Sequence, residues 1–223
     1  MKAICVADIH GDMGALLKLR NSISTKGFES VFLLGDYSRG YKDEDENITD
    51  ASSILEILKE FKVWAIPGNC DQRSIVELFK GRNASLHEAV LKLPEATFIG
   101  LGGSNVTPFN TPFEYGERQI SQTLNSLHAK ADTGSRVILL AHAPPKDTKC
   151  DVISSGAHVG STGIREYIEA KQPDLVLCSH IHESGGAQDR IGKTRIVNLG
   201  RLSDGMAYSL SIGLAIALEI YTG

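Results

Sequence analysis

Short polar motifs spread along the 223-residue chain contain seven side chains of the kinds that bind metal ions. They are Asp8, His10, Asp36, Asn69, His142, His180 and His182. Carboxylate, imidazole and carboxamide donors without a cysteine pair suit borderline or hard divalent ions such as manganese, iron, zinc or cobalt. A carboxylate shared by two such ions holds them ~3.5–4 Å apart, the spacing used for in-line displacement at phosphorus. This donor set indicates phosphate-ester chemistry at a two-metal site.

No single motif carries this prediction. Asp8 is equally explained as a residue at a helix entry, and residues 35–36 and 68–69 are ordinary turns. His142 precedes two prolines and fits a loop histidine. The pair at residues 180 and 182 is more specific, because alternate residues of an extended chain can reach one site. The prediction rests on the combination, in a chain with only seven histidines.

The hydrophobic pattern predicts the elements that position these residues. Five short apolar runs each end at one of the motifs: residues 2–7, 31–34, 63–66, 137–140 and 175–177. Helical patterns are expected after Asp12, with Leu16, Leu17 and Ile23 inward, around residues 54–61 and 74–79, and over residues 117–130 and 161–171. Because ligand sites in α/β folds form at the carboxyl ends of strands, the motifs are expected to converge.

The remaining segments are predicted from turn residues and composition. A hairpin is expected from residues 89–93 and 97–101, and the last strands from residues 195–199 and 210–220. The acidic stretch at residues 37–50 is predicted to be a solvated loop, because its acids lack the spacing of a calcium loop. Residues 102–116, rich in Gly, Pro and Asn, are expected to be irregular.

Composition limits the partners. The net charge is −4 and the pI is near 6.0, so no basic excess indicates nucleic-acid binding or a membrane surface. The four cysteines form no CxxC pair, which favours a reducing compartment. No apolar stretch approaches the ~20 residues of a membrane span. We expect one domain over residues 1–223, in the cytoplasm, with a small phosphoester as substrate; a homo-oligomer is left open.

In this order, the motifs resemble the calcineurin-like metallophosphoesterase superfamily, whose pattern is D-x-H, G-D, G-N-H-D/E, H and G-H-x-H. Here the pattern reads Asp8-x-His10, Gly35-Asp36, Gly68-Asn69-Cys70-Asp71, His142 and Ser179-His180-x-His182. The segment at residues 102–116 is similar to the small microbial phosphodiesterase-like branch. The resemblance implies an α/β fold in the form of a four-layer α/β/β/α sandwich, with two mixed β-sheets flanked by helices.

The resemblance also implies roles for the residues. The first metal would be held by Asp8, His10, Asp36 and His182, and the second by Asp36, Asn69, His142 and His180. A hydroxide bridging the two ions would attack phosphorus. The expected cofactors are two divalent ions, with manganese favoured over iron, zinc, nickel or cobalt. The expected catalytic residues are Asn69, Cys70, Asp71 and His142.

The sequence departs from the family pattern at two positions. Ser179 replaces a glycine, which is tolerable unless the backbone there needs a positive φ. Cys70 replaces a histidine that would protonate the leaving group, and a thiol is a weak donor and no cation at pH 7. A good leaving group, a metal-bound water or another histidine would cover the loss. His87 is one candidate, although a plain structural role is favoured for it.

Several readings stay open from the sequence. Arg73 either contacts a phosphate or is a solvated arginine at a helix start, and Asn105 and Thr107 either face the substrate or serve turns. The chain is interpreted as a phosphodiesterase or phosphomonoesterase. The alternatives are a non-enzymatic scaffold of the same fold, which the complete ligand set disfavours, and a nuclease, which Cys70 and the lack of basic charge disfavour.

Overall fold

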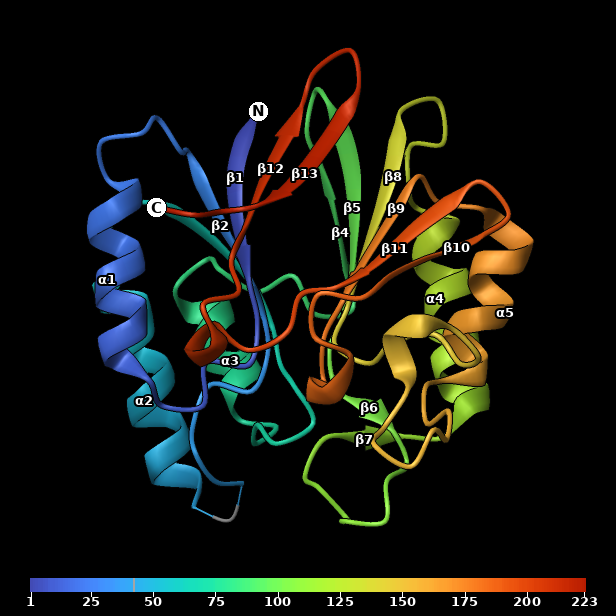
Figure 1. Cartoon of the computed structure of the whole chain (residues 1–223), viewed down its shortest axis with the longest axis horizontal. Coiled ribbons are helices and arrows are strands. Elements are labelled where there is room, and N and C mark those ends of the chain that lie inside the picture. The colour runs from blue at the N-terminus through green and yellow to red at the C-terminus, as the bar shows by residue number, and fades with distance from the viewer. Residues whose placement is uncertain (42) are drawn as a thin grey trace.

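Two β-sheets pack face to face, and helices cover both outer faces (Figure 1). The computed structural model describes residues 1–41 and 43–223. This arrangement is the four-layer sandwich of two mixed sheets that the resemblance predicts, and it confirms the expected fold class.

The first sheet has five strands. In spatial order they are β13 (Ile216–Ile220), β12 (Tyr208–Ile212), β1 (Lys2–Val6), β2 (Ser30–Leu34) and β3 (Lys62–Ile66). β1, β2 and β3 run parallel, while β12 and β13 are antiparallel to their neighbours. Helices α1 (Met13–Ile23), α2 (Glu44–Ile57) and α3 (Ile75–Gly81) pack on its outer face. β1 and β2 are apolar nearly throughout, as expected for strands covered on both faces.

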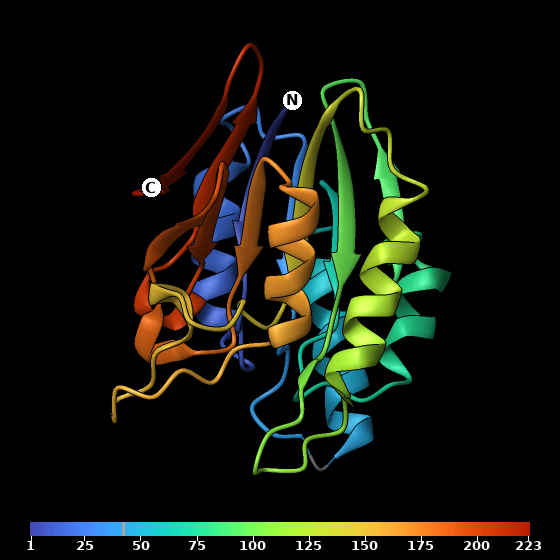
Figure 2. The same ribbon diagram turned by 90° about the vertical axis from the view of Figure 1, so that its right-hand side faces the viewer.

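The second sheet has six strands. In spatial order they are β10 (Gln188–Ile191), β11 (Thr194–Asn198), β9 (Leu175–Cys178), β8 (Arg136–Ala141), β5 (Ala96–Leu101) and β4 (Ala89–Lys92). The four inner strands are parallel, and the two edge strands are antiparallel. Helices α4 (Glu117–His128) and α5 (Thr162–Lys171) cover its outer face (Figure 2). A separate parallel pair joins β6 (Ser104–Asn105) and β7 (Glu114–Tyr115).

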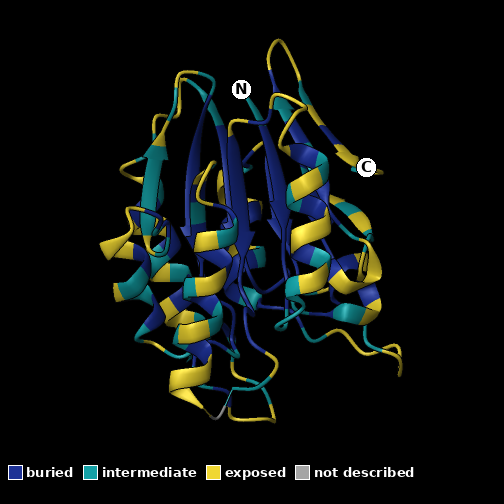
Figure 3. Ribbon diagram, turned by 90° about the vertical axis from the view of Figure 1, so that its left-hand side faces the viewer, coloured by how far each residue is buried: buried dark blue, intermediate teal, exposed yellow. Residues whose placement is uncertain are grey.

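Three single-turn 3-10 helices complete the elements: η1 (Lys149–Asp151), η2 (His182–Ser184) and η3 (Leu202–Asp204). Side chains from both sheets fill the space between the sheets, where Phe32 stacks on Phe98 with ring centroids 4.7 Å apart. Figure 3 shows the central strands fully buried, while the helices expose one face. The strand ends are therefore held by a rigid core.

The expected loop at residues 37–50 is wrong from residue 44 onward, because α2 begins there. Asp43 caps this helix by accepting the Glu46 backbone N–H at 3.0 Å, and three acidic residues fill the first turn. Negative charge is favourable at a helix N-terminus, so the acidic run stabilises the first turn of α2. This turn lacks the regularly spaced apolar residues by which a helix is recognised in a sequence. Lys42, part of the same predicted loop, lies outside the described residues.

Helix α1 corrects a second detail. Asp12 caps it as predicted, accepting the Ala15 N–H at 2.9 Å. Leu17, however, is 46% exposed, whereas Leu16, Leu19 and Ile23 are buried. Positions i, i+3 and i+7 share one helix face, which position i+1 does not.

The hairpin of β4 and β5 is confirmed. The single strand region expected at residues 210–220 is a second hairpin, β12 and β13, and β10 was not predicted. The four cysteines are free thiols, and only Cys70 is not fully buried. Over the described residues, no helix combines the length and the apolar character needed to cross a bilayer.

Candidate metal centre

The sequence motifs meet at one end of the sandwich, where β1, β2 and β3 of one sheet and β8 and β9 of the other terminate (Figure 1). Backbone hydrogen bonds join their ends. The Asp8 N–H donates to the Gly35 carbonyl at 3.0 Å, and the Ser179 N–H donates to the His142 carbonyl at 2.9 Å. The turns that follow the strands are therefore fixed relative to one another within each sheet.

Four of the seven candidate ligands have a left-handed backbone. Their φ angles are +48° at Asp8, +46° at His10, +54° at Asp36 and +69° at His180. Residues with a Cβ rarely adopt this region, and each such residue costs of the order of 1 kcal/mol or more. The backbone N–H of His10 donates to the Asp36 carbonyl at 2.9 Å, which helps to hold this conformation. Four of the nine non-glycine residues with a positive φ in the described part of the chain are therefore candidate ligands.

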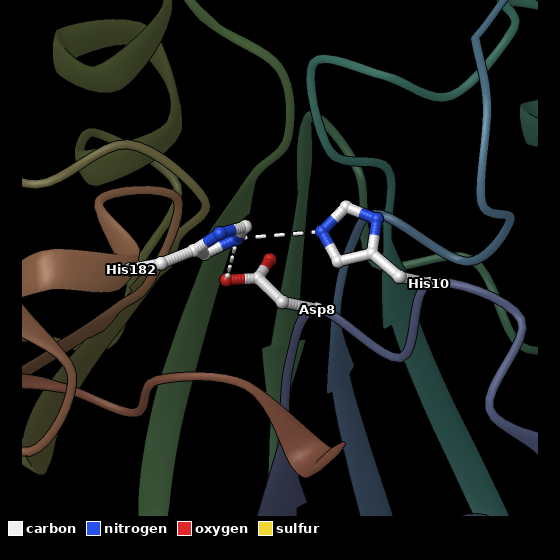
Figure 4. A group of neighbouring side chains, drawn as sticks. All are labelled: Asp8, His10 and His182. Atoms are coloured by element: carbon white, nitrogen blue, oxygen red, sulfur yellow. Dashed lines mark hydrogen bonds and ion pairs between the residues drawn. The ribbon is translucent and has the colours of Figure 1, made fainter. Parts of the chain in front are cut away.

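One group of ligand atoms comes from Asp8 and His10, on the turn after β1, and from His182, after β9, and the three side chains face one another (Figure 4). His182 Nε2 lies 3.3 Å from Asp8 Oδ2 and 3.3 Å from His10 Nε2. His10 Nδ1 lies 3.2 Å from the Ser38 carbonyl, so Nδ1 carries the proton and leaves Nε2 with a free lone pair. Three donor atoms at these distances could hold one metal ion.

A second group gathers around His142 Nε2, which lies 3.0 Å from Asn69 Oδ1 and 3.5 Å from Asp36 Oδ2. The His142 ring is 5.2 Å from the His180 ring, centroid to centroid. His142 Nδ1 donates to the Leu34 carbonyl at 2.7 Å, so Nε2 is the ring nitrogen that faces Asn69 and Asp36. Burial lowers the pKa of His142, but the charge of Asp36 outweighs this and raises it to about 9, so an ion at Nε2 would displace a proton.

Asp36 lies between the two groups. Its Oδ2 atom is 3.8 Å from His10 Nε2 as well as 3.5 Å from His142 Nε2. Asp8 also reaches both sides, since its Oδ1 atom is 3.8 Å from His142 Nδ1. A single carboxylate oxygen within reach of both groups is what a bridging ligand requires.

The residues present fit divalent cations. Asp8 is 1% exposed, and its Oδ1 atom is buried with no hydrogen-bond partner. A buried carboxylate oxygen left unpaired is costly unless a cation or donor compensates it. Burial raises the pKa of Asp36, but the nearby His142, His10 and His180 outweigh this and lower it, so Asp36 is charged. Burial and the charge of His142 lower the pKa of His180 to about 4, so His180 is neutral, as a ligand must be.

The Asp71 carboxylate accepts hydrogen bonds, mainly from backbone N–H groups of the neighbouring turns. It is fully buried, and its two oxygens accept four N–H groups at 2.7–3.0 Å. The donors are the backbone N–H groups of Asp36, Tyr37 and Gly68 and the side-chain amide of Asn47. Asp71 therefore fixes the turns that carry Asp36 and Asn69 and is a positioning residue.

Cys70 and Ser179 contact the carboxylates. The Cys70 N–H donates to Asp36 Oδ1 at 2.9 Å, and burial together with the charge of Asp36 raises the pKa of its thiol. A thiol held protonated is neither a cation nor a nucleophile. The Ser179 hydroxyl donates to Asp8 Oδ2, and the positive φ falls on the next residue, His180, so serine is accommodated.

The hydrogen bonds and ring contacts of the other candidates are with groups other than the seven candidate ligands. His87 Nδ1 accepts the Gly102 N–H at 3.0 Å, and burial lowers the pKa of this histidine to about 4. Arg73 lies 4.5 Å from the Phe113 ring centroid. Asn105 donates to the Val159 carbonyl, and Thr107 donates to Glu114. These residues shape the segments that surround the site.

Two supporting features were missed from the sequence. Asn47 is fully buried on α2 and bonds Asp71, but it lies in a stretch interpreted as a loop. Gly68 allows a close approach, because a Cβ there would lie 2.0 Å from Asp36 Oδ1. The glycines before Asp36 and Asn69 were the available signal, since Gly35 has a φ of +92° and a Cβ there would lie 2.3 Å from Gly68 N.

Comparison with known proteins agrees with this geometry. Residues 1–184 match the calcineurin-like phosphoesterase family. An uncharacterized protein of Methanocaldococcus jannaschii, MJ1162, is 33% identical over 205 residues, covering 89% of this chain and 87% of that protein. A dimetal phosphatase from Danio rerio has a similar fold, with a TM-score of 0.74 at 11% identity over 99% of this chain and 95% of that one. A novel archaeal phosphodiesterase has a similar fold, with a TM-score of 0.57 at 12% identity over 99% of this chain and 100% of that one.

The fold and the site together define a class of protein: α/β/β/α sandwiches with a cluster of nitrogen and oxygen metal ligands where the strands of the two sheets end. Within this class, the chain belongs to the calcineurin-like phosphoesterase family.

Proposed function

We propose that the chain is a dinuclear-metal-dependent phosphodiesterase that hydrolyses a small phosphoester. The observation that carries the proposal is the position of Asp36 Oδ2, 3.8 Å from His10 Nε2 and 3.5 Å from His142 Nε2. Asp8, His10, Asp36 and His182 would hold one ion, and Asp36, Asn69, His142 and His180 the other. Manganese is the favoured metal, because the donors are carboxylates, imidazoles and one carboxamide.

When bound, the two ions supply positive charge for the phosphate oxygens and lower the pKa of a coordinated water. The protein holds its ligands ready for this. Proton positions are fixed at His10 and His142 by the Ser38 and Leu34 carbonyls, and His180 is neutral. Asp71 and Cys70 orient Asp36 through N–H bonds, so the bridging carboxylate loses little freedom on binding ions.

The residue beside the site that replaces a general acid limits the leaving groups that the site can use. Because the Cys70 thiol stays protonated and is a weak donor, little help is available for a poor leaving group. An ester with a stable leaving group needs the least protonation. A diester is the favoured substrate because an archaeal protein of similar fold is a phosphodiesterase. Four cysteines without a disulfide also fit a reducing compartment such as the cytoplasm.

The test is hydrolysis of bis(p-nitrophenyl) phosphate and p-nitrophenyl phosphate by purified protein loaded with manganese. We expect a higher kcat/KM for the diester, loss of activity in EDTA, and recovery on returning manganese. Hydrolysis of neither ester with two ions bound would indicate the non-enzymatic scaffold. A higher kcat/KM for the monoester would indicate a phosphomonoesterase.

A further inference from the structure

The loop between β6 and β7 is tied directly to a candidate metal ligand. The Phe113 N–H donates to the Asn69 carbonyl at 3.1 Å, and the Asn69 side-chain amide donates to the Thr111 hydroxyl at 3.1 Å. Arg73, four positions after Asn69, lies over the Phe113 ring and donates to the Glu114 carbonyl at 3.1 Å. These contacts connect residues 40 to 44 positions apart, so the loop is fixed to the turn that carries Asn69.

The loop is also held from within. A single carboxylate oxygen, Glu114 Oε1, accepts the Thr107 hydroxyl at 2.6 Å, the Thr111 N–H at 2.8 Å and the Thr111 hydroxyl. The Phe109 N–H in turn donates to the Thr107 hydroxyl at 3.2 Å. The loop is therefore an ordered structure, whose conformational entropy has already been lost in folding.

This ordered loop holds two large apolar side chains in water. Val106 is 68% exposed and Phe109 is 70% exposed. Within residues 1–41 and 43–223, the other exposed large hydrophobic residues are Leu17, Leu214 and Ile220, and none of them is aromatic. An exposed aromatic ring on a rigid loop is typical of a residue that meets a ligand.

The loop lies at the same end of the molecule as the metal ligands. Figures 1 and 2 show residues 106–113 projecting beyond β6 and β7 at the end where β1, β5 and β8 terminate. Phe109 is two residues from Thr111, whose hydroxyl contacts the Asn69 side chain, so its Cα lies within about 7 Å of the Thr111 Cα. A group attached to a phosphate at the metal centre would be bounded by this loop.

We propose that Phe109 stacks on a flat aromatic group, such as a nucleobase, that is esterified to the phosphate of the substrate. The inference rests on the proposed function, because it takes the phosphate to be bound at the metal centre. Stacking on a preordered ring costs little further entropy and tolerates different bases. The substrate class is thus a nucleotide-like phosphoester rather than an ester of a small aliphatic alcohol.

A cavity of about 740 Å³, lined in part by the residues that follow His182, is the competing position for the organic group. Val152, Ile153 and residues 183–187 line it, together with Lys149 and Ser154. It contains no aromatic side chain, so it offers a flat base no stacking partner. The loop at residues 106–113 is therefore the better match for an aromatic group.

The experiment is calorimetric titration of the manganese-loaded protein with thymidine 5′-monophosphate and with 2-deoxyribose 5-phosphate, in which a hydroxyl group replaces the base. For the wild type we expect thymidine monophosphate to bind about five- to tenfold more tightly, from the usual strength of an aromatic pair. Phe109→Ala should abolish this ratio, while Phe109→Tyr should keep it. Leu214→Ala is the matched control, because Leu214 is equally apolar and fully exposed at the far end of β12, beside the start of β1.

Equal affinities for the two ligands in the wild type, no binding of thymidine monophosphate, or an unchanged ratio in Phe109→Ala would overturn the inference. Loss of the ratio in Ile153→Ala but not in Phe109→Ala would assign the base to the cavity instead and would also overturn it. Hydrolysis of bis(p-nitrophenyl) phosphate by the wild type is measured separately, as the test of the proposed function. Its absence would defeat the proposed function, whereas a ratio that depends on Phe109 would still support the stacking site.

Discussion

Replacing Asp71 with asparagine separates a positioning role from a chemical one. The carboxylate accepts four N–H groups, two at each oxygen, and is fully buried. An asparagine keeps one acceptor oxygen and turns an NH₂ group toward the other two donors. Two buried donors thereby lose their acceptor while the side-chain volume is nearly unchanged.

The expected loss of stability follows from these two donors. Leaving a buried donor unpaired costs about 1–3 kcal/mol, so the Asp71→Asn protein should be about 3 kcal/mol less stable. For a chain of this length, such a loss lowers Tm by roughly 6–12 °C. Because the same bonds orient Asp36, the variant should also need more manganese to reach full activity.

The assay is urea unfolding in EDTA, which removes the contribution of bound metal to stability. It is combined with a titration of activity against manganese concentration. Asp12→Asn is the matched control, because Asp12 accepts one helix N–H and asparagine caps a helix equally well. An Asp71→Asn protein with wild-type stability and two bound ions but no activity would refute the positioning role and make Asp71 part of the chemistry.

Two further predictions concern His87 and Cys70. The pKa of buried His87 is lowered to about 4 from an ordinary 6.5, so as the pH falls below 6.5 the unfolded chain gains the proton first and stability decreases. By pH 4 the free energy of unfolding should have fallen by roughly 3 kcal/mol from this group alone. Urea unfolding of His87→Gln should lack this loss, and the same pH profile in the variant as in the wild type would contradict the prediction. Cys70→Ser should keep both metals and much of the activity toward good leaving groups. Cys70→His should raise kcat/KM by up to ~10²-fold for poor leaving groups; an unchanged dependence on leaving-group pKa would show that position 70 does not reach the leaving oxygen.

The sequence predicted the layers well where the pattern was local. β1, β2, β3, β8 and β9 are short apolar runs bounded by polar motifs, so their existence and their ends could be inferred. α2 could not, because its first turn is stabilised by a cap and by acidic charge rather than by an apolar face. β10 is an edge strand of alternating exposure and lacks the apolar run that marks the inner strands.

At the candidate site, the sequence predicted which residue types come together, from the order of the motifs. It could not give the geometry, since that depends on contacts between distant positions. The left-handed residues Asp8, His10, Asp36 and His180 each donate their backbone N–H to a residue distant in the sequence. The four hydrogen bonds to Asp71 could not be inferred from the sequence for the same reason. The sequence predicted a catalytic role for Asp71, whereas these bonds indicate a positioning role.

The central claim is a pair of metal ions that share Asp36, and metal analysis of the purified protein after manganese loading tests it most directly. We expect two manganese ions per chain in the wild type. In Asp36→Ala we expect loss of metal binding and no hydrolysis, because one side chain serves both ions, while the control Asp12→Asn should keep two. Two ions per chain in Asp36→Ala would contradict the shared carboxylate and remove Asp36 from the centre of the site.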